Sequence, residues 1–185
     1  TREHEANLAF AASRAAEEPN VAEYQAFLGV TYVEMGRHAE AIPRLQAALR
    51  LKDTSASTRN NLGVALMAEG RLDDAVVEFR RAELIPYNLG NALSRLSRRA
   101  EAIAAYERAL AINKDLVDAH VNLAVVLTAV GRRDDAFGHY ARAVELRPDA
   151  AVIHMNYGAA LAAAGRFQDA MVHTRRALEI DPANV

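Results

Sequence analysis

The chain has 185 residues, of which 51% are hydrophobic and 25% are charged, a balance typical of a globular protein. Its formal net charge is −2 and its sequence pI is about 6.3, so the chain offers no positive field for nucleic acid or an anionic membrane. The absence of cysteine excludes disulfides and thiol catalysis.

The first 20 residues are predicted to form a separate N-terminal helix rich in alanine. Two interpretations of this helix remain open: a cap on the structure that follows, or the second half of a truncated repeat. No apolar run in the sequence reaches the roughly 18 residues typical of a membrane-spanning helix.

Beyond this helix, glycine recurs with a fixed period of 34 residues. The pairs with this spacing are Gly29 and Gly63, Gly36 and Gly70, and Gly131 and Gly165. Alanine likewise recurs at two small-residue places, for example at Ala41 and Ala75. A period of this length indicates stacked helical hairpins and favours binding over catalysis.

Five helix–turn–helix repeats are predicted, over residues 22–55, 56–85, 86–116, 117–150 and 151–185. In the first repeat, Leu28, Gly29 and Tyr32 share one face of the first helix, and the glycine permits close approach of its neighbour. We expect residues 1–185 to form a single domain, and a further repeat to follow Val185.

The third repeat is short. Gly63 and Gly90 are 27 residues apart, seven fewer than the period. This leaves two alternatives, a real deletion or a loop missing from the sequence. In either case Pro86 is expected in the first turn of a helix, where a missing N–H is tolerated.

These features resemble the tetratricopeptide repeat family. The second repeat carries the signature at Leu62, Gly63, Leu66, Gly70, Ala75, Phe79 and Ala82. The resemblance implies an all-α fold, an α-solenoid that coils as a right-handed superhelix and is lined on its concave side by the first helices. The large aromatic residue that the family has near the start of each first helix is missing, and Gln25, Arg59, Pro86, His120 and His154 stand there.

Asparagine occupies the same place in the first helices of four consecutive repeats, at Asn61, Asn88, Asn122 and Asn156. An Asn amide matches the hydrogen-bonding groups of a peptide unit. With helices about 8–10 Å apart and an extended chain advancing about 3.3–3.6 Å per residue, one Asn would contact every third ligand residue. The pattern resembles the asparagine ladder of O-linked N-acetylglucosamine transferase repeats. The alternative is that these residues cap or bridge neighbouring helices.

The predicted peptide-binding groove combines these four asparagines with further residues of the first helices: Val30, Val64, Met67, Asn91, Arg95 and Val125. The predicted function is a protein-interaction scaffold that binds an extended or helical partner segment. Two alternatives remain: a substrate-recognition fragment of a larger enzyme such as a glycosyltransferase, or a structural module that self-associates through an uncapped last helix.

No catalytic residues, cofactor or metal site are predicted, because the sequence contains no phosphate loop, zinc-protease motif or nucleophile elbow. His120 and His154 stand one repeat apart, about 8–10 Å, too far to share a metal ion. They are therefore interpreted as packing residues. The predicted partner is a protein or peptide, without nucleic acid or membrane insertion, and the predicted location is cytoplasmic, with the periplasm as the alternative.

Overall fold

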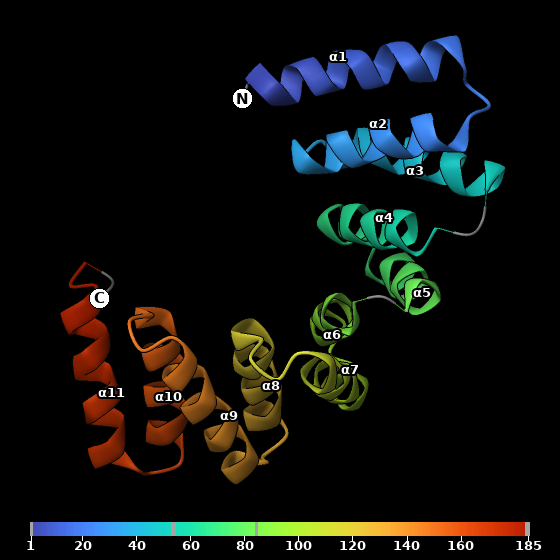
Figure 1. The fold of residues 1–185 in the computed structure, drawn as a ribbon. Coiled ribbons are helices and arrows are strands. Elements are labelled where there is room, and N and C mark those ends of the chain that lie inside the picture. The colour runs from blue at the N-terminus through green and yellow to red at the C-terminus, as the bar shows by residue number, and fades with distance from the viewer. Residues whose placement is uncertain (1, 53–54, 84, 184–185) are drawn as a thin grey trace. The chain divides into compact units, whose positions relative to one another are not determined.

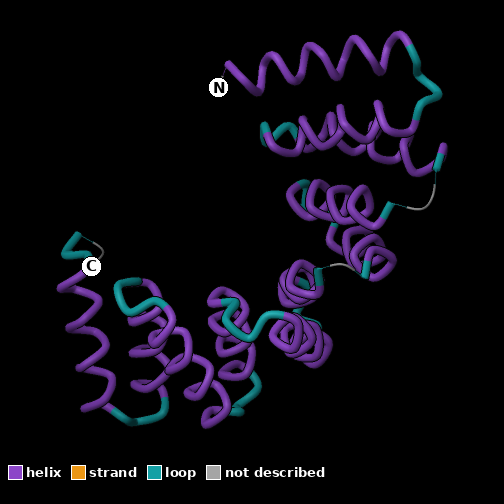
Figure 2. The backbone as a smooth tube through the Cα atoms, viewed as in Figure 1, coloured by secondary structure: helices purple, strands orange, loops and turns teal. Residues whose placement is uncertain are grey.

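A computed structural model describes residues 2–52, 55–83 and 85–183, with side chains from residue 5 onward. These residues form eleven α-helices and no strand (Figures 1 and 2). The helices fall into two compact units, Thr1–Leu96 and Ser97–Val185. The predicted all-α class is confirmed. None of the described helices combines the length and the apolar character that crossing a membrane requires.

The first unit contains six helices. They are α1 (Arg2–Glu17), α2 (Ala22–Glu34), α3 (His38–Leu51), α4 (Ala56–Ala68), α5 (Leu72–Ala82) and α6 (Pro86–Arg95). Each helix packs against the next, and α2 also contacts α4. The N-terminal helix α1 packs through the buried Ala11 and Ala15 against Leu28 of α2. It thus covers a face of the first hairpin that would otherwise be open.

The second unit contains five helices. They are α7 (Arg99–Ile112), α8 (Val117–Ala129), α9 (Arg133–Leu146), α10 (Ala151–Ala163) and α11 (Phe167–Ile180). Contacts join α7 to α8, α8 to α9, α9 to α10 and α10 to α11, and α8 also contacts α10. The alanines at the recurrent small-residue places are buried in both units, including Ala41, Ala75 and Ala136, each with no exposed surface.

The turns inside the hairpins explain one of the two recurrent glycine places. Gly36, Gly70, Gly131 and Gly165 have φ angles of 72°, 77°, 82° and 79°. This left-handed conformation ends a helix and is easiest for glycine. In the first turn the Arg37 N–H donates to the Tyr32 carbonyl and the Gly36 N–H to the Val33 carbonyl. Ser97, with φ of 58°, occupies the same place in the third repeat.

The seven-residue shortfall is distributed over two helices and their connection. Helix α5 has 11 residues and α6 has 10, whereas the second helix α3 has 14 and the first helix α4 has 13. The connection of residues 83–85 is one residue shorter than residues 52–55, which join α3 to α4. Pro86 stands in the first turn of α6, as predicted.

Candidate functional site

All ten predicted groove residues lie on the first helices of their repeats and are partly or fully exposed. In the first unit, Val30 lies on α2, Asn61, Val64 and Met67 on α4, and Asn88, Asn91 and Arg95 on α6; in the second unit, Asn122 and Val125 lie on α8 and Asn156 on α10. We call each unit's set its first-helix face. The first unit brings together seven of the predicted residues, and the second unit three.

Two hydrogen bonds join α4 and α6 on the first-helix face of the first unit. The Asn88 side-chain nitrogen donates to the Asn60 side-chain oxygen over 3.0 Å. The Arg95 guanidinium donates to the Met67 carbonyl over 2.9 Å, at the C-terminal end of α4 where helix carbonyls lack intrahelical partners. These bonds fix the spacing of two neighbouring first helices.

The asparagines already make contacts within the protein. The side-chain N–H of Asn61 donates a hydrogen bond to the Ser57 carbonyl of the same helix over 3.1 Å. Asn88 bridges two helices. The alternative that these asparagines bridge neighbouring helices therefore applies to Asn88. Among the described residues, neither the Asn61 nor the Asn88 side-chain oxygen accepts a hydrogen bond. These oxygens are the groups that a ligand N–H could reach.

Several exposed apolar residues on the first helices were not predicted. Phe27 takes the asparagine place in the first repeat, is 41% exposed, and meets the Phe10 ring edge-on at 6.3 Å between centroids. Val152 and Met155 of α10 are 59% and 39% exposed. Their spacing of three residues at the start of a first helix could have indicated a shared apolar face, because residues three apart lie on one side of a helix.

The missing family aromatic is replaced by polar side-chain pairs that cross the hairpin. Each pair joins residues 19 positions apart on the first and second helices, and we call it a hairpin bridge. The bridges are Gln25–Arg44 at 3.5 Å, Arg59–Glu78 at 2.9 Å, His120–His139 at 2.9 Å and His154–His173 at 3.0 Å. These pairs were not predicted, although the common separation of 19 residues between the paired positions is a signal in the sequence.

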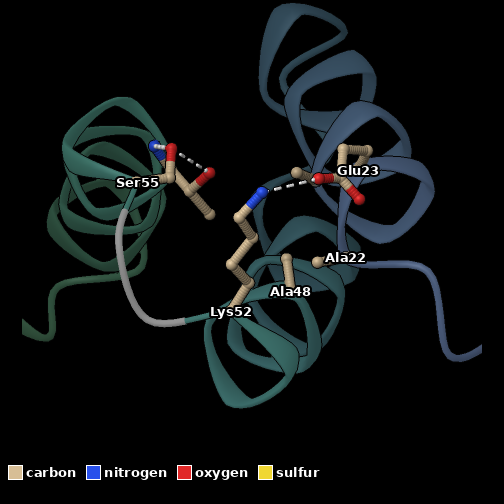
Figure 3. Close-up of a pocket in the computed structure, with 7 residues that line it drawn as sticks. Ala22, Glu23, Ala48, Lys52 and Ser55 are labelled. Atoms are coloured by element: carbon tan, nitrogen blue, oxygen red, sulfur yellow. Dashed lines mark hydrogen bonds and ion pairs between the residues drawn. The ribbon is translucent and has the colours of Figure 1, made fainter.

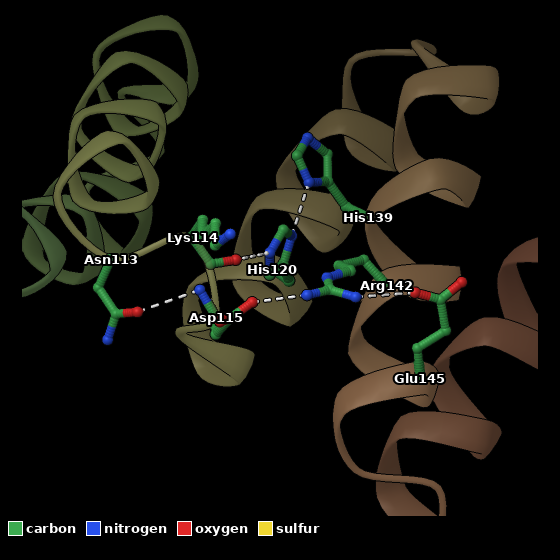
Figure 4. A network of polar contacts seen from close by, with 7 residues as sticks. All are labelled: Asn113, Lys114, Asp115, His120, His139, Arg142 and Glu145. Carbon is green, nitrogen blue, oxygen red and sulfur yellow. Dashed lines mark hydrogen bonds and ion pairs between the residues drawn. The ribbon is translucent and has the colours of Figure 1, made fainter.

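Backbone carbonyls hold the first residue of three bridges. Gln25 donates to the Pro19 carbonyl over 3.1 Å, His120 to that of Lys114 over 2.9 Å, and His154 to that of Pro148 over 3.0 Å. In each case the carbonyl lies six residues earlier in the chain. Figure 4 shows His120 between the Lys114 carbonyl and the His139 ring.

The charge state of the histidine bridges follows from their surroundings. Burial lowers the pKa of His139, and the neighbouring His120 lowers it further. Burial and His154 act in the same way on the pKa of His173. Within the described chain, no three His, Cys, Asp or Glu side chains converge on a position that could hold a metal ion.

A cavity of about 330 Å³ in the first unit lies among α2, α3 and the start of α4 (Figure 3). It is lined by Ala22, Glu23, Ala26, Ala48, Lys52, Ser55 and Thr58. The Lys52 ammonium contacts the Glu23 carboxylate at 3.1 Å. A backbone hydrogen bond and the bond from Lys52 lower the pKa of Glu23. Because Lys52 is already paired, this cavity offers small apolar surface rather than a charge for a ligand.

Family comparisons agree with this architecture. Residues 28–88 match a model described as Tetratricopeptide repeat, residues 90–131 match one described as TPR repeat, and residues 115–183 match a further Tetratricopeptide repeat model. The matches run through nearly all of residues 28–183. The chain is a tetratricopeptide-repeat protein. No curated protein matches its sequence significantly.

Solved tetratricopeptide-repeat structures share the fold at low sequence identity. YrrB, described as a TPR protein with an unusual peptide-binding site, is 20% identical with a TM-score of 0.80, over 94% of this chain and 93% of YrrB. A MamA structure is 24% identical with a TM-score of 0.78, over 84% of this chain and 95% of that one. MamA 41-end from Desulfovibrio magneticus RS-1 is 18% identical with a TM-score of 0.83, over 88% and 96%. The predicted α-solenoid class is confirmed.

Proposed function

We propose that this tetratricopeptide-repeat protein is an interaction scaffold that binds an extended segment of a partner protein on its first-helix faces. The observation that supports this best is the set of side chains that stay partly exposed on adjacent first helices of the first unit. They combine apolar surface at Val64 and Met67 with the free amide oxygens of Asn61 and Asn88.

The chemistry of this face suits a peptide backbone. An extended ligand points successive side chains in opposite directions, so its backbone N–H groups can reach the asparagine oxygens while alternate aliphatic side chains contact valine and methionine. Val64 and Met67 follow Asn61 at intervals of three residues and therefore lie on its side of α4. The peptide-binding site in the name of YrrB supports a peptide as the class of ligand.

A matched pair of substitutions tests this proposal. Val125 on the first helix α8 is 45% exposed, and Val77 on the second helix α5 is 46% exposed. Peptides that bind the chain are first selected from a random displayed library, and their dissociation constants are then measured. Val125→Arg is expected to weaken binding of these peptides by about tenfold or more, because it places a charge on apolar contact surface.

The control is Val77→Arg, for which we expect unchanged affinity. Both variants should keep the helicity and melting temperature of the parent chain, since both sites are exposed. Equal loss of affinity in both variants, or loss in Val77→Arg alone, would place the binding site away from the first helices.

Self-association through α11 is a second candidate, favoured by a stripe of exposed apolar residues. Phe167, Met171 and Leu178 are 65%, 54% and 40% exposed and follow one another at helical intervals. If this stripe pairs two copies, sedimentation velocity should show a mass that rises with concentration, and Met171→Glu should return the chain to a monomer. A monomer of the parent chain at all concentrations would exclude this function.

A further inference from the structure

We propose that the two histidine bridges act as pH-sensitive clasps that hold the α8–α9 and α10–α11 hairpins closed at neutral pH and release them on acidification. The bridges are His120–His139 and His154–His173, with 2.9 Å and 3.0 Å between their Nδ1 atoms. The two pairs occupy equivalent places, so one physical argument covers both.

The hydrogen-bond geometry defines the neutral state of each pair. A carbonyl oxygen only accepts, so His120 must carry its hydrogen on Nε2 in order to donate to the Lys114 carbonyl. Its Nδ1 then has a lone pair, and the Nδ1–H of His139 donates to it. Every nitrogen of the buried His120 is satisfied when both rings are neutral. His154 repeats the arrangement with the Pro148 carbonyl and His173.

Protons disturb this arrangement step by step. The partly exposed His139 can take one proton on Nε2 and keep its bond to His120. The charge then lies in a partly buried place beside a second imidazole, and both burial and the neighbouring His120 disfavour it there. An open hairpin has no such restriction, since both imidazoles are then hydrated. Acid therefore favours the open form.

The groups around the first pair moderate this effect without reversing it. A cavity of about 500 Å³ beside the pair is lined by Glu107 of α7, Leu127 of α8, Arg132 just before α9, and Asp134, Asp135, Gly138 and Arg142 of α9. Asp135 and Glu107 favour the charged form of His139, whereas Arg132 opposes it. The Arg142 guanidinium donates to Asp115 and Glu145. With burial and His120 acting in the other direction, the pKa of His139 stays below its ordinary value.

The second pair has fewer compensating charges. Asp169 of α11 is the carboxylate that favours protonated His173, and the Tyr157 ring of α10 lies 4.3 Å from the His173 ring between centroids. Arg176 beside this pair donates to Asp149. The pKa of His173 is lowered, with burial as the largest cause. Both histidines therefore stabilise the fold fully above their ordinary pKa of 6.5, and this stability is lost as pH falls below that value.

Among the described side chains of the first unit, the hairpin bridges contain no histidine. They are Gln25–Arg44 and Arg59–Glu78. Helices α4 and α5 contain no histidine. The clasp therefore belongs to the second unit. Asn122 and Asn156 each stand two residues after a clasp histidine, so, given the function proposed above, acidification would also disturb that unit's first-helix face.

Hydrogen exchange of the whole chain, without any partner, tests the clasp. Amide protection factors, corrected for the intrinsic exchange rate, are compared at about pH 7.5 and pH 5.5, where surface carboxylates remain ionised. Helices α8 to α11 are expected to lose roughly tenfold in protection relative to α4 and α5. An equal change in both sets of helices would overturn the proposal, whatever the chain binds.

Two sets of variants assign the effect to the pairs. In His139→Asn and His173→Asn, an amide that does not titrate replaces the second ring and can still donate a hydrogen bond to His120 or His154. These variants should lose the extra pH dependence. The combined Arg59→His and Glu78→His substitutions place a histidine pair in α4 and α5 and should make that hairpin acid-sensitive. Unchanged pH dependence in the asparagine variants, or an acid-insensitive α4–α5 hairpin in the histidine variant, would contradict the mechanism.

Discussion

Replacing Glu78 with alanine is expected to lower the free energy of unfolding by about 3 kcal/mol, because it removes the carboxylate that a largely buried guanidinium contacts. The Arg59 and Glu78 side chains are only 11% and 15% exposed, and their charged atoms are 2.9 Å apart. Arg59 stands where the family has a packed aromatic residue, between the two helices of a hairpin. Urea unfolding of the Glu78→Ala variant, followed by circular dichroism, measures the loss.

Two controls separate burial from charge. Glu40→Ala breaks the Arg37–Glu40 pair, whose side chains are 40% and 50% exposed, and should change stability far less than Glu78→Ala does. The double variant Arg59→Met and Glu78→Leu removes both charges and should recover most of the stability lost in Glu78→Ala. Equal effects of Glu78→Ala and Glu40→Ala would show that this hairpin bridge contributes little to the fold.

Replacing Gly63 with alanine is expected to destabilise the chain by about 2 kcal/mol through overpacking. A Cβ atom at Gly63 would stand 2.6 Å from Cε1 of Phe79, and the Phe79 ring is only 4% exposed. The ring has little space in which to move, so α4 and α5 would have to separate. The gain in helix propensity from glycine to alanine, roughly 0.5–1 kcal/mol, offsets only part of this effect. Chemical denaturation provides the measurement.

Gly138 offers the matched control, because it also lies inside a helix but a Cβ there would meet no atom within 4 Å. Gly138→Ala should therefore raise the free energy of unfolding by roughly 0.5–1 kcal/mol. A smaller side chain at the contact should also relieve the clash, so Phe79→Leu should cost less in the Gly63→Ala background than alone. Stabilisation by Gly63→Ala would disprove the close approach of the two helices.

The repeat architecture could be predicted from sequence because the backbone restricts which residues fit at two places. Gly70 adopts a positive φ, and Gly63 lies where a Cβ would strike Phe79. Each of these requirements recurs with the repeat, so the spacing of glycines revealed the hairpins. Ser97 shows the limit of this argument, since it takes the turn conformation without being glycine.

The side-chain pairings could not be predicted in the same way. Whether His120 meets His154 or His139 depends on how the two helices of a hairpin are rotated about their axes, and the repeat period alone does not define that rotation. The asparagine place illustrates a related difficulty. Asn88 and Asn61 occupy the same position, yet one bonds to the neighbouring helix and the other to its own. A ligand would compete with such contacts for the asparagine side chains. Which contact forms depends on the three-dimensional geometry around each asparagine.

The first helices are proposed to form the peptide-binding site, and photo-crosslinking tests this proposal most directly. A peptide selected for binding is synthesised with a benzophenone side chain, irradiated in complex with the chain, and located by mass spectrometry. The proposed function predicts crosslinks on α2, α4, α6, α8 or α10, near residues such as Val64 and Val125. Crosslinks confined to the second helices α3, α5, α7, α9 or α11 would contradict it.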